Sequence, residues 1–246
     1  VVYFLWALEN WLCGLEIMAQ IPLPIRLDIH ARFSTFVAGE NQVVLNHLLG
    51  ISAGQRAQVL WIWGPSGSGK SHLLQALCTS ENDSGRPAIY LPMKGPGLPG
   101  PGVLDGLEAL DLVAIDDVEQ VAGMSDWEHA LFALYNELLT QEGCLLMTAS
   151  RPPSVIAFSL PDLASRAAGA VVYRLEPLGE DAALVALKEH ASCRGLELPD
   201  ASAHYLMRHV ERNMSALCGS LEKLDVASMV SQRRLTVPFI RDVLEI

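Results

Sequence analysis

Residues 59–71 read VLWIWGPSGSGKS, and this stretch decides the fold. The first part, Val59-Leu60-Trp61-Ile62-Trp63, is continuously apolar, as in a strand that a parallel sheet buries on both faces. The second part, Gly64-Pro65-Ser66-Gly67-Ser68-Gly69-Lys70-Ser71, matches the phosphate-binding pattern G-x-x-x-x-G-K-[ST] in full. The stretch therefore predicts a strand, a phosphate-binding loop and the start of a helix.

Each residue type in this loop has a role in holding phosphates. The glycines let backbone N–H groups turn toward phosphate oxygens, and the helix N-terminus adds its positive dipole end. Lys70 is expected to reach the β- and γ-phosphates, and the Ser71 hydroxyl to bind Mg²⁺. Residues 64–71 are thus the predicted site for ADP or ATP with Mg²⁺.

Two further strand ends carry polar residues suited to the same site. The stretch Leu112-Val113-Ala114-Ile115 is apolar and ends in Asp116 and Asp117. We expect Asp116 to hold Mg²⁺, and Asp117 to position or deprotonate an attacking water. The strand at 144–148 leads to Ser150. Either Ser150 or Thr148 contacts the γ-phosphate or the water, or both only cap the strand, and the residues alone leave these alternatives open.

The remaining pattern predicts the element order. We expect strands at 88–91, 112–115, 144–148 and 171–175, alternating with helices at 41–50, 71–79 and 125–142. Ser125 and Glu128 fit a capping box at the start of the last of these helices. Four helices at 180–194, 200–211, 215–232 and 236–245 follow. The expected fold is α/β, a doubly wound parallel sheet at 31–175 with a small helical domain at 176–246.

The composition limits the function classes. Half of the 246 residues are hydrophobic and the net charge is −11, so a strong direct nucleic-acid binder is disfavoured. The cysteines are scattered singly, which predicts buried reduced thiols and a cytoplasmic protein: Cys13, Cys78, Cys144, Cys193 and Cys218. The histidines form no ligand set, and we assign them structural or surface roles.

The N-terminal region divides at Met18. Residues 1–17 are apolar but include Glu9 and Glu16, lack a basic start, and are short for a membrane span. We expect an upstream extension there, with a membrane anchor as the alternative. Residues 18–30 begin with Gln20-Ile21-Pro22-Leu23-Pro24-Ile25, whose prolines predict an extended, exposed peptide.

Several of these motifs together resemble those of Hda, a DnaA-related family of AAA+ proteins, over residues 18–246. Phe33-Ser34-Thr35-Phe36-Val37-Ala38-Gly39-Glu40-Asn41 resembles the family's adenine-side box, which implies that Phe36 and Val37 contact the nucleotide. Thr148-Ala149-Ser150-Arg151 occupies the sensor 1 position. Leu160-Pro161-Asp162-Leu163-Ala164-Ser165-Arg166 is similar to the segment that holds the arginine finger. Residues 235–239 also look Hda-like.

The resemblance implies a negative regulator of DNA replication initiation. Gln20, Leu23 and Ile25 would bind the DNA polymerase sliding clamp (its beta subunit), and Arg166 would act in trans on ATP held by DnaA. From the residues alone, Arg166 is better interpreted as a surface arginine on a loop. The family's sensor 2 arginine is replaced by Ser215, with Arg212 nearly one turn away. This departure implies weak or absent ATP hydrolysis by the chain itself.

Other functions remain open at this point. The chain is alternatively a helicase-loader or transposition-helper ATPase, a non-catalytic clamp adaptor, or a truncated DnaA-like initiator. Chains of this kind often assemble head to tail, so a homo-oligomer is a further alternative. The sequence does not fix the bound nucleotide.

Overall fold

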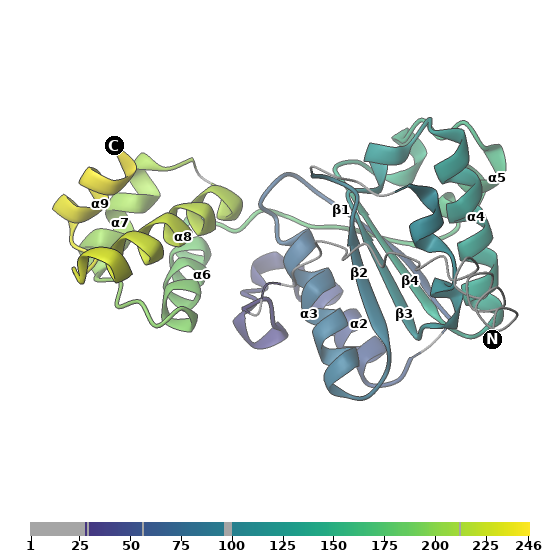
Figure 1. Ribbon diagram of the computed structural model, residues 1–246, viewed down its shortest axis with the longest axis horizontal. Helices are drawn as coiled ribbons and strands as arrows, with labels where there is room; N and C mark the ends of the chain where they lie inside the picture. Colours follow the sequence, from purple (N-terminus) through teal and green to yellow (C-terminus); the bar gives the residue numbers. More distant parts are fainter. Residues whose placement is uncertain (1–27, 29, 56, 96–99, 212) are drawn as a thin grey trace, which may run out of the picture.

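The computed structural model describes residues 28, 30–55, 57–95, 100–211 and 213–246 (Figure 1). Within these residues, one sheet contains five parallel strands in the order β2-β3-β4-β1-β5. The strands are β1 (Val59–Trp63), β2 (Ala88–Pro92), β3 (Leu112–Asp116), β4 (Cys144–Ala149) and β5 (Val171–Arg174). The predicted parallel sheet is confirmed, and β1 lies between β4 and β5.

The strand register brings the predicted site residues to one edge of the sheet. Trp63 at the end of β1 is level with Ala149 at the end of β4, and Ile115 of β3 is level with Met147. The backbone N–H of Gly64 continues the ladder by donating to the Ala149 carbonyl at 3.3 Å. The phosphate loop, the Asp116–Asp117 pair and the 148–150 segment therefore meet where three adjacent strands end.

Helices cover both faces of the sheet (Figure 1). The helices α2 (Gln42–Ser52) and α3 (Lys70–Asp83) pack on one face, and α4 (Ser125–Thr140) and α5 (Pro161–Ala168) on the other. Side chains alternate along a strand. Leu60 and Ile62 therefore pack in the core beneath α2 and α3, and Trp61 packs in the core beneath α4 and α5. All three are fully buried, as the apolar run of β1 predicts.

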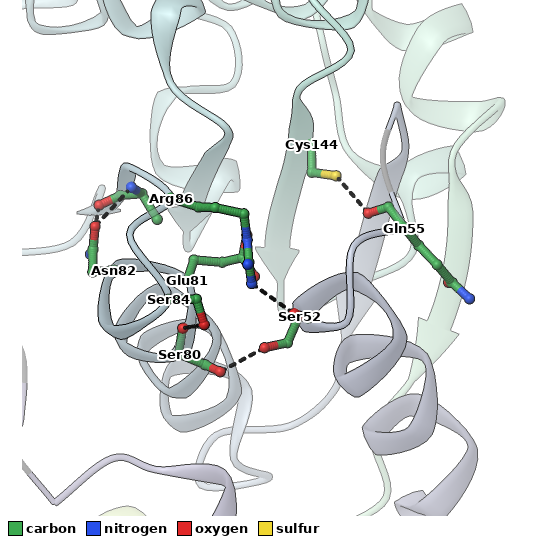
Figure 2. Close-up of polar contacts among 9 residues, drawn as sticks. Ser52, Gln55, Ser80, Glu81, Asn82, Ser84, Arg86 and Cys144 are labelled. Carbon is green, nitrogen blue, oxygen red and sulfur yellow. Dashed lines mark hydrogen bonds and ion pairs between the residues drawn. The ribbon is translucent and has the colours of Figure 1, made fainter.

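A polar cluster ties α2 to the C-terminal end of α3 (Figure 2), at the opposite end of that helix from Lys70. The Arg86 guanidinium donates to both oxygens of buried Glu81, at 2.9 and 2.8 Å, and to the Ser52 carbonyl at 2.7 Å. The Ser52 and Ser80 hydroxyls lie 2.6 Å apart. These bonds fix the far end of the helix whose first residue is Lys70.

The C-terminal helices form a separate body with its own core (Figure 1). They are α6 (Glu180–Cys193), α7 (Asp200–His209), α8 (Met214–Ser231) and α9 (Val237–Leu244). Leu187, Leu206 and Leu221 are fully buried between them. We call this body the lid, because α6 and α8 reach the edge of the sheet where the phosphate loop lies. Among the helices described, none is long and apolar enough to cross a membrane.

The structure corrects two local expectations. Residues 161–168 form the helix α5, with Pro161 in its first turn, so Arg166 lies on a helix and not on a loop. The capping box is also wrong. Helix α4 has no side-chain cap, and the Glu128 carboxylate accepts from the N–H groups of Gly123, Ser159 and Leu160. The sequence pattern missed this because two of the three donors are remote along the chain.

The prediction of buried thiols is only partly correct. Cys78 and Cys144 are buried, and burial raises the pKa of the Cys78 thiol to about 12. Cys193 is exposed at the end of α6, and Cys218 is half-buried. No local pattern separated the two pairs, because the burial depends on how the helices and the strand β4 that carry them pack. Cys13 lies outside the described residues.

Candidate functional site

The phosphate loop has the backbone conformation that its glycines permit. Gly67 and Gly69 have φ angles of +73° and +97°, in the left-handed region where a Cβ atom is unfavourable. A Cβ on Gly69 would also lie 2.8 Å from Cε2 of Phe36. The loop therefore needs glycine at 69 both for its curvature and for contact with the 33–37 segment.

A cavity of about 720 Å³ opens where the loop, the strand ends and the lid meet. Its volume is in the range of small-molecule sites. From the body with the sheet it is lined by Phe36, Val37, residues 66–71, His72, Asp117, Glu119 and Ser150, among others. From the lid and the residues just before it, it is lined by Leu178, Ala186, His190, Met214, Ser215, Cys218, Gly219 and Glu222. The cavity thus brings together most of the predicted nucleotide residues.

Lys70 is the first residue of α3, and its ammonium group is held by the loop itself. Nζ donates to the carbonyls of Gly64 at 2.8 Å and Pro65 at 3.0 Å. Burial lowers the pKa of Lys70, and the nearby charges of Asp117 and Asp116 oppose that shift. A phosphate would offer this desolvated cation a charged acceptor, which is a stronger partner than a carbonyl.

Asp116 is buried behind the cavity and does not line it. Its Oδ2 accepts from the Tyr90 hydroxyl at 2.7 Å, and its Oδ1 accepts from the Thr148 hydroxyl. Burial and the adjacent Asp116 charge raise the pKa of Tyr90. The carboxylate is therefore fixed by two neutral donors, and Thr148 has a structural partner that explains its burial.

Asp117 lines the cavity in a strained conformation. Its φ angle is +55°, unusual for a residue with a side chain, and its N–H donates to the Thr148 hydroxyl at 3.0 Å. Burial, Asp116 and Glu119 raise the pKa of Asp117, while Lys70 opposes them. This is the combination of desolvation and like charge expected of a general base.

Glu119 is a cavity residue that the sequence reasoning missed. Its Oε1 accepts from the Ser150 N–H at 2.7 Å, and its Oε2 is buried with no hydrogen-bond partner among the described residues. Ser150 is exposed to the cavity. The sequence signal available for Glu119 was its position two residues after Asp117. The direction of its side chain depends on the short turn at Val118–Val121, which the sequence did not predict.

The donor set fits a nucleotide with Mg²⁺. The Ser68 hydroxyl is buried beside the cavity without a partner in the described structure, as expected of a group awaiting a ligand. The described residues contain no cluster of three or more His, Cys, Asp or Glu side chains suited to a metal. Mg²⁺ commonly relies on phosphates, waters and one or two protein ligands. Ser71 and the carboxylates of the Asp116–Asp117 pair would supply the protein ligands.

The N-terminus of α8 lies against the phosphate loop. A Cβ on Gly67 would lie 2.9 Å from Cβ of Asn213 and 3.0 Å from the Met214 nitrogen. The Asn213 side chain caps α8 by accepting from the Ala216 N–H at 2.8 Å. Ser215 follows in the first turn and lines the cavity. Arg212, the alternative sensor 2 residue, lies outside the described residues.

Two histidines to which the sequence analysis assigned structural or surface roles line the cavity. His72 of α3 and His190 of α6 both line it, with ring centroids 5.5 Å apart and planes at 87°. They are 118 positions apart in the sequence. No local pattern links them, because only the docking of the lid brings them together.

Arg166 and the N-terminal peptide lie apart from this cavity. Arg166 is exposed near the end of α5, with its guanidinium 5.6 Å from the Tyr135 ring centroid, and it does not line the cavity. Gln20, Leu23 and Ile25 lie outside the described residues, so their predicted role stays a prediction.

Both parts of the chain are similar to known proteins. The family described as "Hda, lid domain" matches residues 180–244. The structure of domain III of Thermotoga maritima DnaA is similar with a TM-score of 0.76 and 22% identity, covering 90% of this chain and 98% of that one.

Two further structures share the fold at lower similarity. AMPPCP-bound DnaA from Aquifex aeolicus has a TM-score of 0.67 at 21% identity, covering 84% of this chain and 68% of that one. The RuvB branch migration motor of Thermotoga maritima has a TM-score of 0.58 at 18% identity, covering 83% and 68%. These likenesses confirm the predicted P-loop AAA+ fold with its helical lid. Residues 180–244 thus resemble the Hda lid domain, and the chain shares the fold of DnaA domain III.

Proposed function

We propose that this protein is a negative regulator of DNA replication initiation that binds ADP or ATP with Mg²⁺ and stimulates ATP hydrolysis by DnaA. Tethered to the DNA-loaded sliding clamp through Gln20, Leu23 and Ile25, it presents Arg166 to the ATP of a DnaA molecule. An arginine finger acts by stabilising charge on the transferred phosphoryl group, and is worth about 10³–10⁵ in rate.

The position of Arg166 carries the proposal. The side chain is exposed on α5 and stands outside the chain's own cavity. Helix α5 is held by the buried Glu128 carboxylate, which binds the N–H groups of Ser159 and Leu160 just before it. A cation fixed on a rigid helix, away from its own nucleotide, suits action on a partner's nucleotide.

The lid residues that line the cavity support weak ATP hydrolysis by the chain itself. None of the described lid residues that line the cavity is an arginine or a lysine. Ser215 stands in the first turn of α8, near the loop, and Glu222 adds a negative charge. A γ-phosphate would therefore gain no positive partner from these residues, whereas ADP needs none.

The test follows hydrolysis of DnaA-bound ATP in the presence of loaded clamp and the full chain. We expect clamp-dependent acceleration, and loss of about 10³-fold stimulation or more with Arg166→Ala. Arg241→Ala, at an exposed position on α9, is the matched control and should stimulate normally. Gln20→Ala should lose clamp retention in a pull-down.

Two outcomes would reject this function. Full stimulation by Arg166→Ala would remove the finger role. No stimulation by the wild-type chain, with clamp and nucleotide binding both measured directly, would favour a non-catalytic adaptor or a helicase-loader type of ATPase.

A further inference from the structure

The charge of Arg166 has an aromatic partner on the neighbouring helix. Its guanidinium lies over the ring of Tyr135 on α4, with Cζ 5.6 Å from the ring centroid. A cation within roughly 6 Å of a ring centroid is attracted by the ring face. Among the described residues, the guanidinium forms no ion pair and no hydrogen bond, even with Asp162 one turn earlier on α5. The ring is therefore the partner that this part of the chain provides for the charge.

The sequence of α5 places Arg166 where it can reach that ring. Leu163 and Ala167 point inward and are buried in the same core as Tyr135. Arg166 follows Leu163 by three residues, so it lies at the border between the buried face of α5 and solvent. Helices α4 and α5 are in contact, side by side (Figure 1). A long side chain at such a border can lie along the neighbouring helix and keep its charged end in water.

The ring of Tyr135 is a fixed reference for this mobile side chain. Tyr135 is 7% exposed, whereas Arg166 is exposed. Tyr135 follows Glu128 by seven residues, about two turns, so both lie on the same face of α4. Glu128 binds the backbone just before α5, and Tyr135 holds the guanidinium near its end. One helix therefore aligns both the backbone and the charged group of the α5 segment.

An aromatic partner also leaves the guanidinium available for a phosphate. A ring face attracts the charge and accepts no conventional hydrogen bond, whereas a carboxylate would occupy N–H donors and offset the charge. Arg166 thus keeps its five N–H donors free of described acceptors. An arginine side chain has many rotamers, and placing it on a phosphoryl oxygen requires that most be given up. A ring that restricts them beforehand reduces that cost.

We propose that Tyr135 is the positioning residue of Arg166, holding the guanidinium in the orientation in which it meets the nucleotide of a partner. The role is indirect, because Tyr135 is buried and does not line the chain's own cavity. The inference rests on the finger role of Arg166 proposed above. It separates Tyr135 from a residue that only fills the core, since the ring and not the buried volume is what the guanidinium needs.

The experiment follows single-turnover hydrolysis of DnaA-bound ATP with loaded clamp, over a range of concentrations of the full chain. Tyr135→Leu keeps an apolar side chain but removes the ring. We expect the maximal rate to fall roughly twofold to fivefold, with the half-saturating concentration unchanged. Tyr135→Phe keeps the ring and should keep the wild-type rate. Tyr205→Leu is the matched control, because that half-buried lid tyrosine stacks on His209 and should stimulate normally when replaced.

Nuclear magnetic resonance reports the contact without DnaA. The ring current of Tyr135 should shift the side-chain proton signals of Arg166, and the shift should disappear in Tyr135→Leu and persist in Tyr135→Phe. A full maximal rate for Tyr135→Leu, with the shift lost, would show that the contact does not position the finger. A rise in the half-saturating concentration alone would place Tyr135 in partner docking instead, and equal losses for both variants would exclude the ring as the cause.

Failure of the proposed function has a different signature. Normal stimulation by Arg166→Ala would reject the finger role, and this inference with it, even if the ring-current shift on Arg166 were present. Normal loss with Arg166→Ala, together with an unaltered rate for Tyr135→Leu, would leave the finger role intact and overturn the role of Tyr135 alone.

Discussion

At the scale of single residues, the site contains charged and polar groups that folding leaves incompletely satisfied. Lys70 is desolvated and bound to carbonyls, Asp117 is strained and close to two other carboxylates, and Ser68 and Glu119 each keep a buried atom without a partner in the described residues. Such features lower stability and are retained where a ligand satisfies them.

Lys70→Met tests the charge of the loop. Nucleotide affinity should fall roughly tenfold to a hundredfold, because a charge-assisted hydrogen bond to phosphate is lost. Stability should not fall, since methionine removes a cation whose burial is unfavourable. Calorimetry and chemical denaturation measure the two effects, with Lys188→Met on the lid surface as the control. Unchanged affinity would contradict the assigned role of Lys70.

The buried His190 predicts a dependence of stability on pH. Its pKa is about 4 in the folded chain and 6.5 when unperturbed, so the unfolded chain binds more protons between these values. The free energy of unfolding should therefore fall as pH drops from 6.5 to 4.5, by roughly 2–3 kcal/mol from this residue. The lowered pKa of His72 acts in the same direction.

Denaturant titrations of wild type and His190→Asn at pH 7.5 and 4.5 measure this contribution. The variant should lose less stability on acidification, because asparagine does not titrate. Identical losses in the free energy of unfolding would show that protonation of His190 does not contribute to the loss of stability in acid. The side chains that act on the ring, those of His72, Arg194, Asp28 and His30, are unchanged in the comparison.

At the scale of elements, α5 depends on a remote carboxylate. Glu128 is fully buried in α4 and accepts three backbone N–H groups from the segments that lead into α4 and α5. The sequence pattern identified Glu128 as a helix cap but did not find α5, although Pro161 lies in its first turn and Leu163 and Ala167 are buried on one face. The residues just before α5, Ser159 and Leu160, are held by tertiary hydrogen bonds to Glu128.

Glu128→Gln should destabilise the protein by roughly 1.5–3 kcal/mol, because a neutral amide replaces a charged acceptor and leaves one N–H without a partner. It should also reduce the stimulation of DnaA by loosening the helix that bears Arg166, with nucleotide affinity unchanged. Glu137→Gln, exposed on the same helix, is the control for both measurements. If Glu128→Gln lost stability but stimulated DnaA normally, the rigidity of α5 would not be needed for stimulation.

At the scale of the whole molecule, the cavity belongs to two bodies that have separate cores. The loop and the strand ends come from one body, and α6 and the N-terminal turn of α8 come from the other. Among the described residues, the links between the bodies include the contact of His72 with His190, the approach of Arg194 to Asp28 at 3.8 Å, and the contact of α8 with Gly67. A ligand in the cavity would add contacts to both bodies.

Binding of ADP with Mg²⁺ should therefore stabilise both bodies together. At a free ADP concentration of about 1,000 times the dissociation constant, the gain is about 4 kcal/mol. Hydrogen exchange should slow in α3 and also in α6 and α8, and removal of Mg²⁺ by EDTA should reduce the effect. Protection confined to residues 64–83 would mean that the nucleotide does not bridge to the lid.

The sequence by itself determined the features that are encoded locally. The phosphate loop is contiguous, its glycines fix its conformation, and the apolar runs of β1, β3 and β4 fix the sheet that presents it. The tertiary structure alone decided that His190 and Glu119 line the cavity and that Glu128 binds the segment leading into α5. Their positions depend on how the lid docks and on where buried carboxylates find backbone donors. Those contacts join residues far apart in the chain, so no pattern of spacing in one segment records them.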